Sequence, residues 1–424
     1  MSPGRVWIRR AASLGTMCAL ALGVPPTGLS AQRAPAQRFA RIDAFLDSLV
    51  RAETIGGAVA LILDDGRPIY HRAVGWQDRE ARKPMAETSL FRTASHTKAL
   101  TSVVILGLVD EGRIALDDPA SRWIPSFATT RVASPDGSVV QARRPITIRD
   151  LLTHTSGISY GVDDPVAAAH EAIGLGPGAG AGLGWYLADK DEPICATVER
   201  LPRAPFVAQP GESWVYGYST DVLGCIAERV AGKPLDVLIR ERITGPLGMR
   251  DTYFYVPRAD ADRLAVVYST GSDGRVVRAP LGPRGQGDFV EGPRRSFSGG
   301  SGLVSTAADY ARFLEAIRNG GELDGVRILS PGMVRLMVTN QVGPLYGRAG
   351  RGWGLAFETV ERFGEAGLDP AGSYGWSGAY GSIYKVDPND GIVIVFLTQM
   401  LPLQNAIRQR FVTVAFQALM DEAR

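Results

Sequence analysis

The chain has 424 residues, of which 45% are hydrophobic and 21% charged, and its formal net charge is +2. These values are typical of a globular protein with one large domain or two interlocked lobes, and they exclude a predominantly disordered chain. They indicate no basic surface of the kind that binds nucleic acid, so we expect no nucleic-acid partner.

The first 31 residues differ from the rest of the chain. Three arginines precede an apolar segment over residues 11–24, and small residues follow as far as Ala31. This order is typical of a secretory signal peptide. The apolar segment is too short for a transmembrane helix, which needs about 20 residues. We therefore expect residues 1–31 to be removed and the mature chain, 32–424, to be exported to the periplasm or secreted, without a membrane span.

Both ends of the mature chain predict pairs of strands. Residues 39–54 carry apolar side chains at helical spacing, and residues 56–76 then follow the pattern of two strands joined by a turn at 64–66. A second strand pair is predicted over residues 381–399, and a helix over 404–422 closes the chain. We expect one antiparallel sheet that is built from both termini.

The middle of the chain is mostly helical in pattern. The segments TIRDLLTHTSG and STDVLGCIAERVAG both predict a helix that a glycine ends. Residues 95–294 are therefore expected to form a helical lobe beside an α/β lobe of residues 39–94 and 295–424.

One loop and two cysteines in the helical lobe each allow two interpretations. Residues 174–184, GLGPGAGAGLG, are too rich in glycine for regular structure and form either a surface linker or a border of the active site. Cys195 and Cys225 are the cysteines that remain after removal of the first 31 residues. They either pair in an oxidising compartment or are two small buried apolar residues.

The stretch RTASHTKAL, residues 92–100, contains the strongest catalytic pattern. Ser95 and Lys98 are three residues apart at the start of a predicted helix, so their side chains lie on one face. The chain has five lysines against 41 arginines, so it normally uses arginine for a solvated positive charge. A lysine where a helix enters the core therefore indicates a chemical role that arginine does not fill. Burial disfavours the charged form of a lysine, and a neutral amine beside a hydroxyl is a base beside a nucleophile.

Two other serines fit short catalytic patterns. Ser382 and Lys385 repeat the Ser-x-x-Lys spacing, but on a predicted strand, where residues three apart point to opposite faces. Ser159 lies in GISYG, residues 157–161, which matches the Gly-x-Ser-x-Gly elbow of another esterase class. That elbow requires a strand before the serine and a helix after it, whereas here a helix precedes and a turn follows. We therefore favour Ser95 as the nucleophile.

Six segments resemble landmarks of the serine β-lactamase and penicillin-binding protein superfamily. They are LFRTASHTKALT, LDDPASRWIPSF, ITIRDLLTHTSGI, PGESWVYGYSTDVLG, ERITGPLGMRDTYF and GGSGLVSTAADYARFL. The resemblance is to the class C β-lactamase-like group, which includes carboxylesterases and D-amino-acid peptidases, and covers about residues 39–419. It implies an α+β fold of the β-lactamase/transpeptidase type, in which the antiparallel sheet, flanked by helices, and a mostly helical lobe enclose the active site between them.

The resemblance also implies roles for residues of the first two motifs. Ser95 is then the acyl-accepting nucleophile and Lys98 its paired amine. Tyr216 follows Pro210-Gly211 at the family's distance and is implied as the phenol that exchanges a proton with Lys98. Tyr218 is the alternative match and an expected substrate contact.

The family's third motif falls at Trp376-Ser377-Gly378, which the resemblance places against the substrate. Backbone N–H groups of Ser95 and Ala379 are then expected to form the oxyanion hole. Tyrosine stands at 218 where β-lactamases have asparagine, and Trp376 stands where they have lysine. Both changes remove polar contacts for a β-lactam or a peptide and add aromatic surface, which resembles the esterase branch with its Trp-x-Gly motif.

The histidines suggest no catalytic or metal site. His96 follows the nucleophile directly and therefore points about 100° away from it on a helix, so we expect it to pack in the core or at the rim. His71, His154 and His170 show no metal-ligand spacing. We predict neither a metal nor another cofactor.

The sequence thus predicts an exported serine hydrolase that cleaves a small-molecule carboxylic ester through an acyl-enzyme on Ser95. The nearest alternative is a D-amino-acid peptidase or weak β-lactamase that acts on amides. An alternative of another class is a penicillin-recognising sensor that is acylated once without turnover, and a fourth is a non-catalytic scaffold. The sequence does not indicate whether the protein is a monomer or an oligomer.

Overall fold

The computed structural model describes residues 38–162, 165–176, 186–187, 189–282, 285–365, 367–402 and 405–420. The expected signal peptide and most of the glycine-rich segment lie outside these residues. Within the described ranges, no helix has the length and apolar character needed to cross a membrane.

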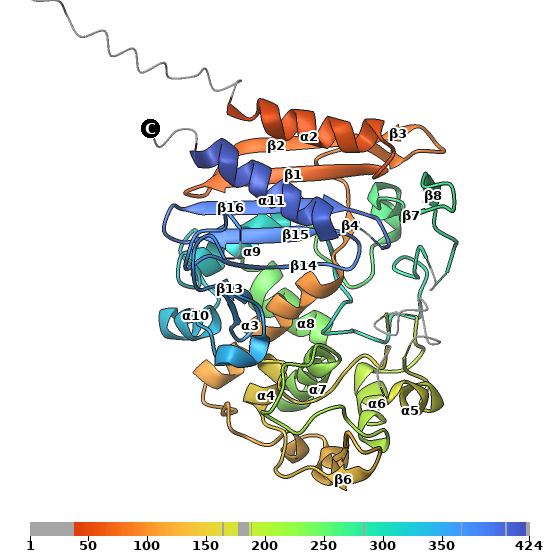
Figure 1. Ribbon diagram of the computed structural model, residues 1–424, viewed down its shortest axis with the longest axis vertical. Helices are drawn as coiled ribbons and strands as arrows, with labels where there is room; N and C mark the ends of the chain where they lie inside the picture. The colour runs from red at the N-terminus through yellow and green to blue at the C-terminus, as the bar shows by residue number, and fades with distance from the viewer. Residues whose placement is uncertain are drawn as a thin grey trace, which may run out of the picture.

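A large antiparallel sheet, built from both ends of the chain, dominates one side of the molecule (Figure 1). Its order among the described residues is β12-β13-β14-β15-β16-β1-β2-β3, so the N-terminal hairpin lies beside the C-terminal one. The strands are β1 (Gly57–Asp64), β2 (Arg67–Asp78), β3 (Lys83–Pro84), β12 (Arg351–Trp353), β13 (Glu358–Val360), β14 (Tyr374–Ser377), β15 (Ile383–Asp387) and β16 (Ile392–Thr398). The sheet expected from the two termini is confirmed.

Four short strand pairs stand apart from this sheet in the described chain, and one of them, β4 with β9, directly precedes Ser95. The pairs are β4 (Phe91–Arg92) with β9 (Val304–Ser305), β5 (Arg131–Ala133) with β6 (Val139–Gln141), β7 (Tyr268–Thr270) with β8 (Val276–Arg278), and β10 (Glu322–Leu323) with β11 (Val326–Arg327). The first pair connects the start of the helical lobe to the segment that follows it in the sequence.

The central strand β1 is apolar on both faces because helices cover both faces of the sheet. Val59 and Leu61 belong to the larger core, whereas Ala60 and Ile62 belong to a second core on the opposite side. This division follows from the two-residue period of a strand. Figure 1 shows α2 (Ala40–Arg51) and α11 (Asn405–Met420) together over one face, with α9 (Ala307–Arg318) on the other.

The helical lobe is organised around α3 and α7, which contact each other. Its helices are α3 (Thr97–Asp110), α4 (Ile148–Leu152), α5 (Ala167–Ala172), α6 (Ile194–Val198), α7 (Ser219–Ala231) and α8 (Leu235–Ile239), and α10 (Pro331–Met337) lies later in the chain. Gly232 ends α7 in the left-handed conformation, as predicted. The expected helix before Gly157 is shorter, because it ends at Leu152 and His154 adopts a positive φ of 56°.

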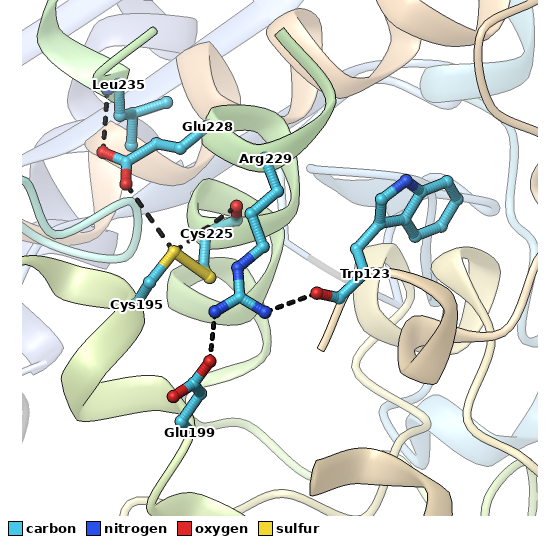
Figure 2. Close-up of a disulfide and its surroundings, with 7 residues drawn as sticks. All are labelled: Trp123, Cys195, Glu199, Cys225, Glu228, Arg229 and Leu235. Carbon is cyan, nitrogen blue, oxygen red and sulfur yellow. Dashed lines mark hydrogen bonds and ion pairs between the residues drawn. A yellow bond between two sulfur atoms is a disulfide. The ribbon is translucent and has the colours of Figure 1, made fainter. Parts of the chain in front are cut away.

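A disulfide joins Cys195 of α6 to Cys225 of α7, which decides between the two interpretations of these cysteines (Figure 2). Arg229, one turn beyond Cys225, donates hydrogen bonds to Glu199 and to the carbonyl of Trp123. The same face of α7 is therefore also held to its neighbours by an ion pair. A disulfide of this loop length typically contributes about 2–4 kcal/mol to stability. The bridge fixes the helix that follows the predicted second motif.

Candidate active site

Ser95 lies in a 3₁₀ turn, Ala94–His96, that leads directly into α3. Ala94 has a φ of +45°, a backbone conformation that is costly for a residue with a Cβ and that clusters at functional sites. Thr93 holds the preceding backbone, since its N–H and its hydroxyl both donate to the carbonyl of Leu303. The turn therefore places a partly exposed serine just before the N-terminus of the buried helix α3.

Lys98 is almost completely buried, with 2% of its surface exposed, and its amine has three hydrogen-bond partners. The Nζ atom lies 3.3 Å from Oγ of Ser95, 2.9 Å from the hydroxyl oxygen of Tyr160 and 2.7 Å from the carbonyl oxygen of Gly300. The structure thus brings together the serine and the lysine that the spacing predicted. The amine is the basic group within hydrogen-bond reach of the Ser95 hydroxyl.

The carbonyl of Gly300 is held in place from α7. The carboxylate of Asp221 accepts hydrogen bonds from the N–H of Gly300, at 3.1 Å, and from Oγ of Ser298, at 2.6 Å. Burial raises the pKa of Asp221, and the nearby charge of Lys98 opposes this rise. Asp221 therefore positions the loop that in turn positions the lysine amine.

Tyr160 and Tyr216 both border the site, but they contact Lys98 in different ways. The Tyr160 hydroxyl bonds the amine, whereas the Tyr216 ring lies with its centroid 4.7 Å from the amine. The hydroxyl of Tyr216 accepts a hydrogen bond of 2.9 Å from the indole N–H of Trp376. Desolvation raises the pKa of Tyr160 well above its usual range, and the neighbouring Tyr216 raises it further. The proton-relay role expected of Tyr216 stays a prediction, and Tyr160 is a second candidate that the motifs did not indicate.

Two glycines explain why Tyr160 reaches the lysine. A Cβ on Gly157, whose φ is +80°, would lie 2.1 Å from the carbonyl oxygen of Ala208. A Cβ on Gly217 would lie 2.2 Å from the carbonyl oxygen of Ile158. The backbone of residues 157–158 can therefore approach residues 208 and 217 this closely only because positions 157 and 217 are glycine.

The rival serines do not reach a lysine amine in this way. Ser159 accepts a hydrogen bond from the N–H of Gly161, and its loop follows a helix rather than a strand, so the elbow is not formed. Ser382 immediately precedes β15, and the amine of Lys385 lies 2.9 Å from a carboxylate oxygen of Asp369. Lys385 lies on β15, as predicted, whereas Ser382 lies one residue before the strand begins.

The third motif borders the same cavity as Ser95. The cavity has a volume of about 170 Å³ and is lined by Ser95, Tyr160, Tyr216, Trp376, Ser377, Gly378, Ala379 and Arg408. A Cβ on Gly378 would lie 2.6 Å from the carbonyl oxygen of Thr93, so glycine is required where β14 ends against the serine turn. The expected oxyanion-hole residues, Ser95 and Ala379, thus face one cavity.

Tyr218 lies behind this cavity rather than on its surface. Its ring is buried and packs edge-on against Tyr160, with 4.9 Å between the ring centroids. The backbone of Gly176 hydrogen-bonds its hydroxyl. Tyr218 therefore supports Tyr160 in the arrangement that the structure shows.

Aromatic side chains form one wall of the site. Trp376 meets Trp353 edge to face at 4.6 Å between centroids, and Trp214 stacks on Tyr216 at 5.7 Å. Such pairs add about 0.5–1.5 kcal/mol each beyond the burial of their surface. They hold Trp376 where its N–H can bond Tyr216.

Two buried histidines near the site predict that stability falls in mild acid. Burial lowers the pKa of His96 to about 3, and burial, with the charge of Lys98, lowers that of His154 well below its usual range. In the unfolded chain both titrate near 6.5. As the pH falls below about 6.5 the unfolded chain therefore binds protons that the folded chain does not, which lowers the free energy of unfolding by up to about 1.4 kcal/mol per pH unit for each histidine.

We expect urea denaturation to show a free energy of unfolding that is lower at pH 5.5 than at pH 6.5 by about 2 kcal/mol, for both histidines together. His96→Gln should reduce the pH dependence by about half. A free energy of unfolding that is unchanged over this interval would contradict the assignment of both histidines as neutral core residues.

Comparisons with known proteins show the family to which the chain belongs. The model of the family described as Beta-lactamase matches residues 42–415. The chain belongs to the beta-lactamase family. Esterase EstB of Burkholderia gladioli is 35% identical over 394 residues, which cover 89% of this chain and 94% of the relative. Lovastatin esterase of Penicillium rubens is 30% identical over 359 residues, which cover 82% of this chain and 84% of the relative.

A solved structure shows the same fold. EstCE1, described as a hydrolase with promiscuous acyltransferase activity, superposes with a TM-score of 0.78 at 28% sequence identity. The match covers 91% of this chain and 99% of that one. The α+β fold of the β-lactamase/transpeptidase type is confirmed, and the chain is a serine hydrolase of the beta-lactamase family.

Proposed function

We propose that the protein is an exported carboxylesterase that works through an acyl-enzyme on Ser95. The observation that carries this proposal is the amine of Lys98, held 3.3 Å from the Ser95 hydroxyl at the edge of a cavity with an aromatic wall. The two curated relatives described above are both named esterases, which supports an ester as the substrate.

The proposed acylation step uses three side chains, Ser95, Lys98 and Tyr216. The Ser95 oxygen attacks the ester carbonyl while its proton passes to the amine of Lys98. The alcohol departs with a proton from the Tyr216 hydroxyl, whose oxygen accepts a hydrogen bond from the indole N–H of Trp376. The ammonium of Lys98 then restores the proton of Tyr216. Water hydrolyses the acyl-enzyme, which releases the carboxylic acid and regenerates Ser95.

Export is supported by two observations. Residues 1–31 have the pattern of a secretory signal peptide. The disulfide between Cys195 and Cys225 is of the kind that persists in oxidising compartments such as the periplasm. Fractionation of the native host, with detection of a chain that begins near residue 32, tests this part of the proposal.

Steady-state hydrolysis of p-nitrophenyl butyrate and of a chromogenic cephalosporin by the mature chain tests the reaction class. We expect sustained turnover of the ester and much slower turnover of the cephalosporin, because Trp376 replaces the cationic residue that β-lactamases use. Cephalosporin turnover that equals ester turnover would favour the β-lactamase or peptidase alternative. A stoichiometric burst without turnover would favour the sensor.

Tyr160→Phe is expected to lower kcat for p-nitrophenyl butyrate by about 10- to 100-fold, which corresponds to one hydrogen bond to a charged or proton-transferring group. The variant keeps the ring but removes the hydroxyl that holds Lys98. Tyr253→Phe is the matched control, because the hydroxyl of Tyr253 bonds Asp251 and Asp260 away from the site. Equal activity of the Tyr160 variant and the control would show that the hydrogen bond between Tyr160 and the Lys98 amine does not contribute to catalysis.

A further inference from the structure

A second cavity, of about 390 Å³, adjoins the active-site cavity. The two cavities share the side chains of Trp376, Ser377 and Arg408 as lining residues. The second cavity extends from these residues to Arg351 of β12 and Lys385 of β15. A substrate bound at Ser95 can therefore extend into it without leaving the protein surface.

Four cationic side chains line this second cavity. Arg348, Arg351, Lys385 and Arg408 line it together with one carboxylate, Glu358. Glu358 bonds Arg348, Arg351 and Lys385, so this single carboxylate is shared by three cations.

A second carboxylate, Asp369, lies deeper and contacts two of the same cations. Its oxygen lies 2.9 Å from Nζ of Lys385 and 3.2 Å from Nη2 of Arg351. Four cations thus stand against two carboxylates in this group of six side chains. The balance of charge at the cavity is positive.

The cluster is enclosed, which strengthens its interaction with an anion. Lys385 has 2% and Arg351 8% of the side-chain surface exposed, whereas Arg348 is 57% exposed and lies at the mouth. Electrostatic attraction is much larger in such partly buried surroundings than in open water. Arginines also bind carboxylates through pairs of charge-assisted hydrogen bonds.

The cluster lies within reach of a substrate on Ser95. Ser377 lines both cavities, and Gly378 and Ala379, which follow it directly, line the first. Arg408 also lines both cavities and donates a hydrogen bond of 3.0 Å to the carbonyl of Gly378. A substrate whose carbonyl lies at Ser95 can therefore place a more distant group in the second cavity.

We propose that the cavity lined by Arg348, Arg351, Lys385 and Arg408 binds a carboxylate of the substrate, so that the enzyme prefers esters that carry a carboxylate several bonds from the reacting carbonyl. The inference rests on the proposed esterase function. It adds a polar contact to a site for which the sequence predicted a loss of polar contacts for a β-lactam or a peptide.

Matched pairs of esters test the preference. The mono-p-nitrophenyl esters of adipic and suberic acid are compared with analogues in which the free carboxylate is capped as a methyl ester. Phenyl butyrate and its para-carboxymethyl derivative test the alcohol side. We expect kcat/KM to favour the anionic member of at least one pair by about tenfold or more, through KM, as for one charge-assisted hydrogen bond.

Arg348→Gln identifies the residues responsible. This change at the exposed mouth should reduce the preference for the anionic ester about tenfold, which corresponds to one charge-assisted hydrogen bond. Arg67→Gln is the matched control, because Arg67 is an exposed arginine on β2, outside both cavities. Equal kcat/KM for anionic and neutral esters in the native enzyme, or a preference that Arg348→Gln and Arg67→Gln change equally, would overturn the proposal.

A binding measurement decides the inference even if no ester is hydrolysed. Sodium adipate should raise the Tm of the native protein relative to sodium chloride of equal ionic strength, and 1,6-hexanediol should not. The rise should be smaller in Arg348→Gln than in Arg67→Gln. Absence of ester turnover together with this rise would overturn the esterase function and keep the anion site. Ester turnover without preference or rise would overturn only the anion site.

Discussion

Lys98→Arg is expected to lower kcat for ester hydrolysis by about 10²–10⁴-fold, the usual contribution of a general base. Arginine keeps the positive charge but does not lose its proton in proteins, so it cannot take the proton of Ser95. The measurement is steady-state hydrolysis of p-nitrophenyl butyrate, with Tm recorded for each variant to separate lost chemistry from lost folding.

Lys233→Arg is the matched control for this substitution. Lys233 is exposed and pairs with Glu241 at 2.6 Å, so an arginine there should leave kcat unchanged. Lys98→Met provides a second test without the larger side chain, since it keeps the length but removes the amine. Activity of Lys98→Arg within a few-fold of the native enzyme would show that the amine is not the base.

Ser95→Ala is expected to reduce ester hydrolysis by about 10⁴-fold or more, because the acyl-enzyme can no longer form. Removal of Oγ leaves the cavity and the position of Lys98 largely unchanged, so the folded protein and its Tm should be retained. The comparison is with Ser159→Ala, which removes the hydroxyl of the other candidate nucleophile while leaving Tyr160 in place.

Ser159→Ala should keep kcat within a few-fold of the native value. Its hydroxyl accepts a hydrogen bond from Gly161 and does not line the cavity. Turnover that survives Ser95→Ala and disappears in Ser159→Ala would show that Ser159, and not Ser95, is the nucleophile. A fall of similar size in both variants would indicate that the loop of Ser159 is needed to place Tyr160.

The local part of the site could be predicted from the sequence because its geometry is set by short spacing. Ser95 and Lys98 are three residues apart, and the helix that begins at Thr97 places them together. The two terminal hairpins could also be predicted from the sequence, since apolar runs and turn residues determine them over a few residues.

Tyr160 could not be predicted in the same way. It is 62 residues from Lys98, and its hydroxyl reaches the amine through a loop without regular structure. The glycines at 157 and 217 were visible, but which backbone each of them passes depends on tertiary contacts. The same reason explains why GISYG resembled a nucleophile elbow, although its tyrosine rather than its serine points toward the site.

The charged cavity also could not be predicted from the sequence motifs. The replacement of lysine by Trp376 suggested that cationic contacts had been lost from the site. The structure instead shows Arg408, from the C-terminal helix, bordering both cavities, with Arg351 and Lys385 from different strands close by. These side chains are brought together by the sheet and by α11, which no local spacing encodes.

Mass spectrometry of the acyl-enzyme tests whether Ser95 is the nucleophile. The mature enzyme is mixed with p-nitrophenyl butyrate, quenched in acid within milliseconds, and digested with trypsin. We predict a mass increase of one butyryl group on the peptide TASHTK, residues 93–98, with fragmentation that places it on Ser95 and with no adduct in Ser95→Ala. An adduct on the peptide that contains Ser159, or turnover without any covalent adduct, would contradict the account.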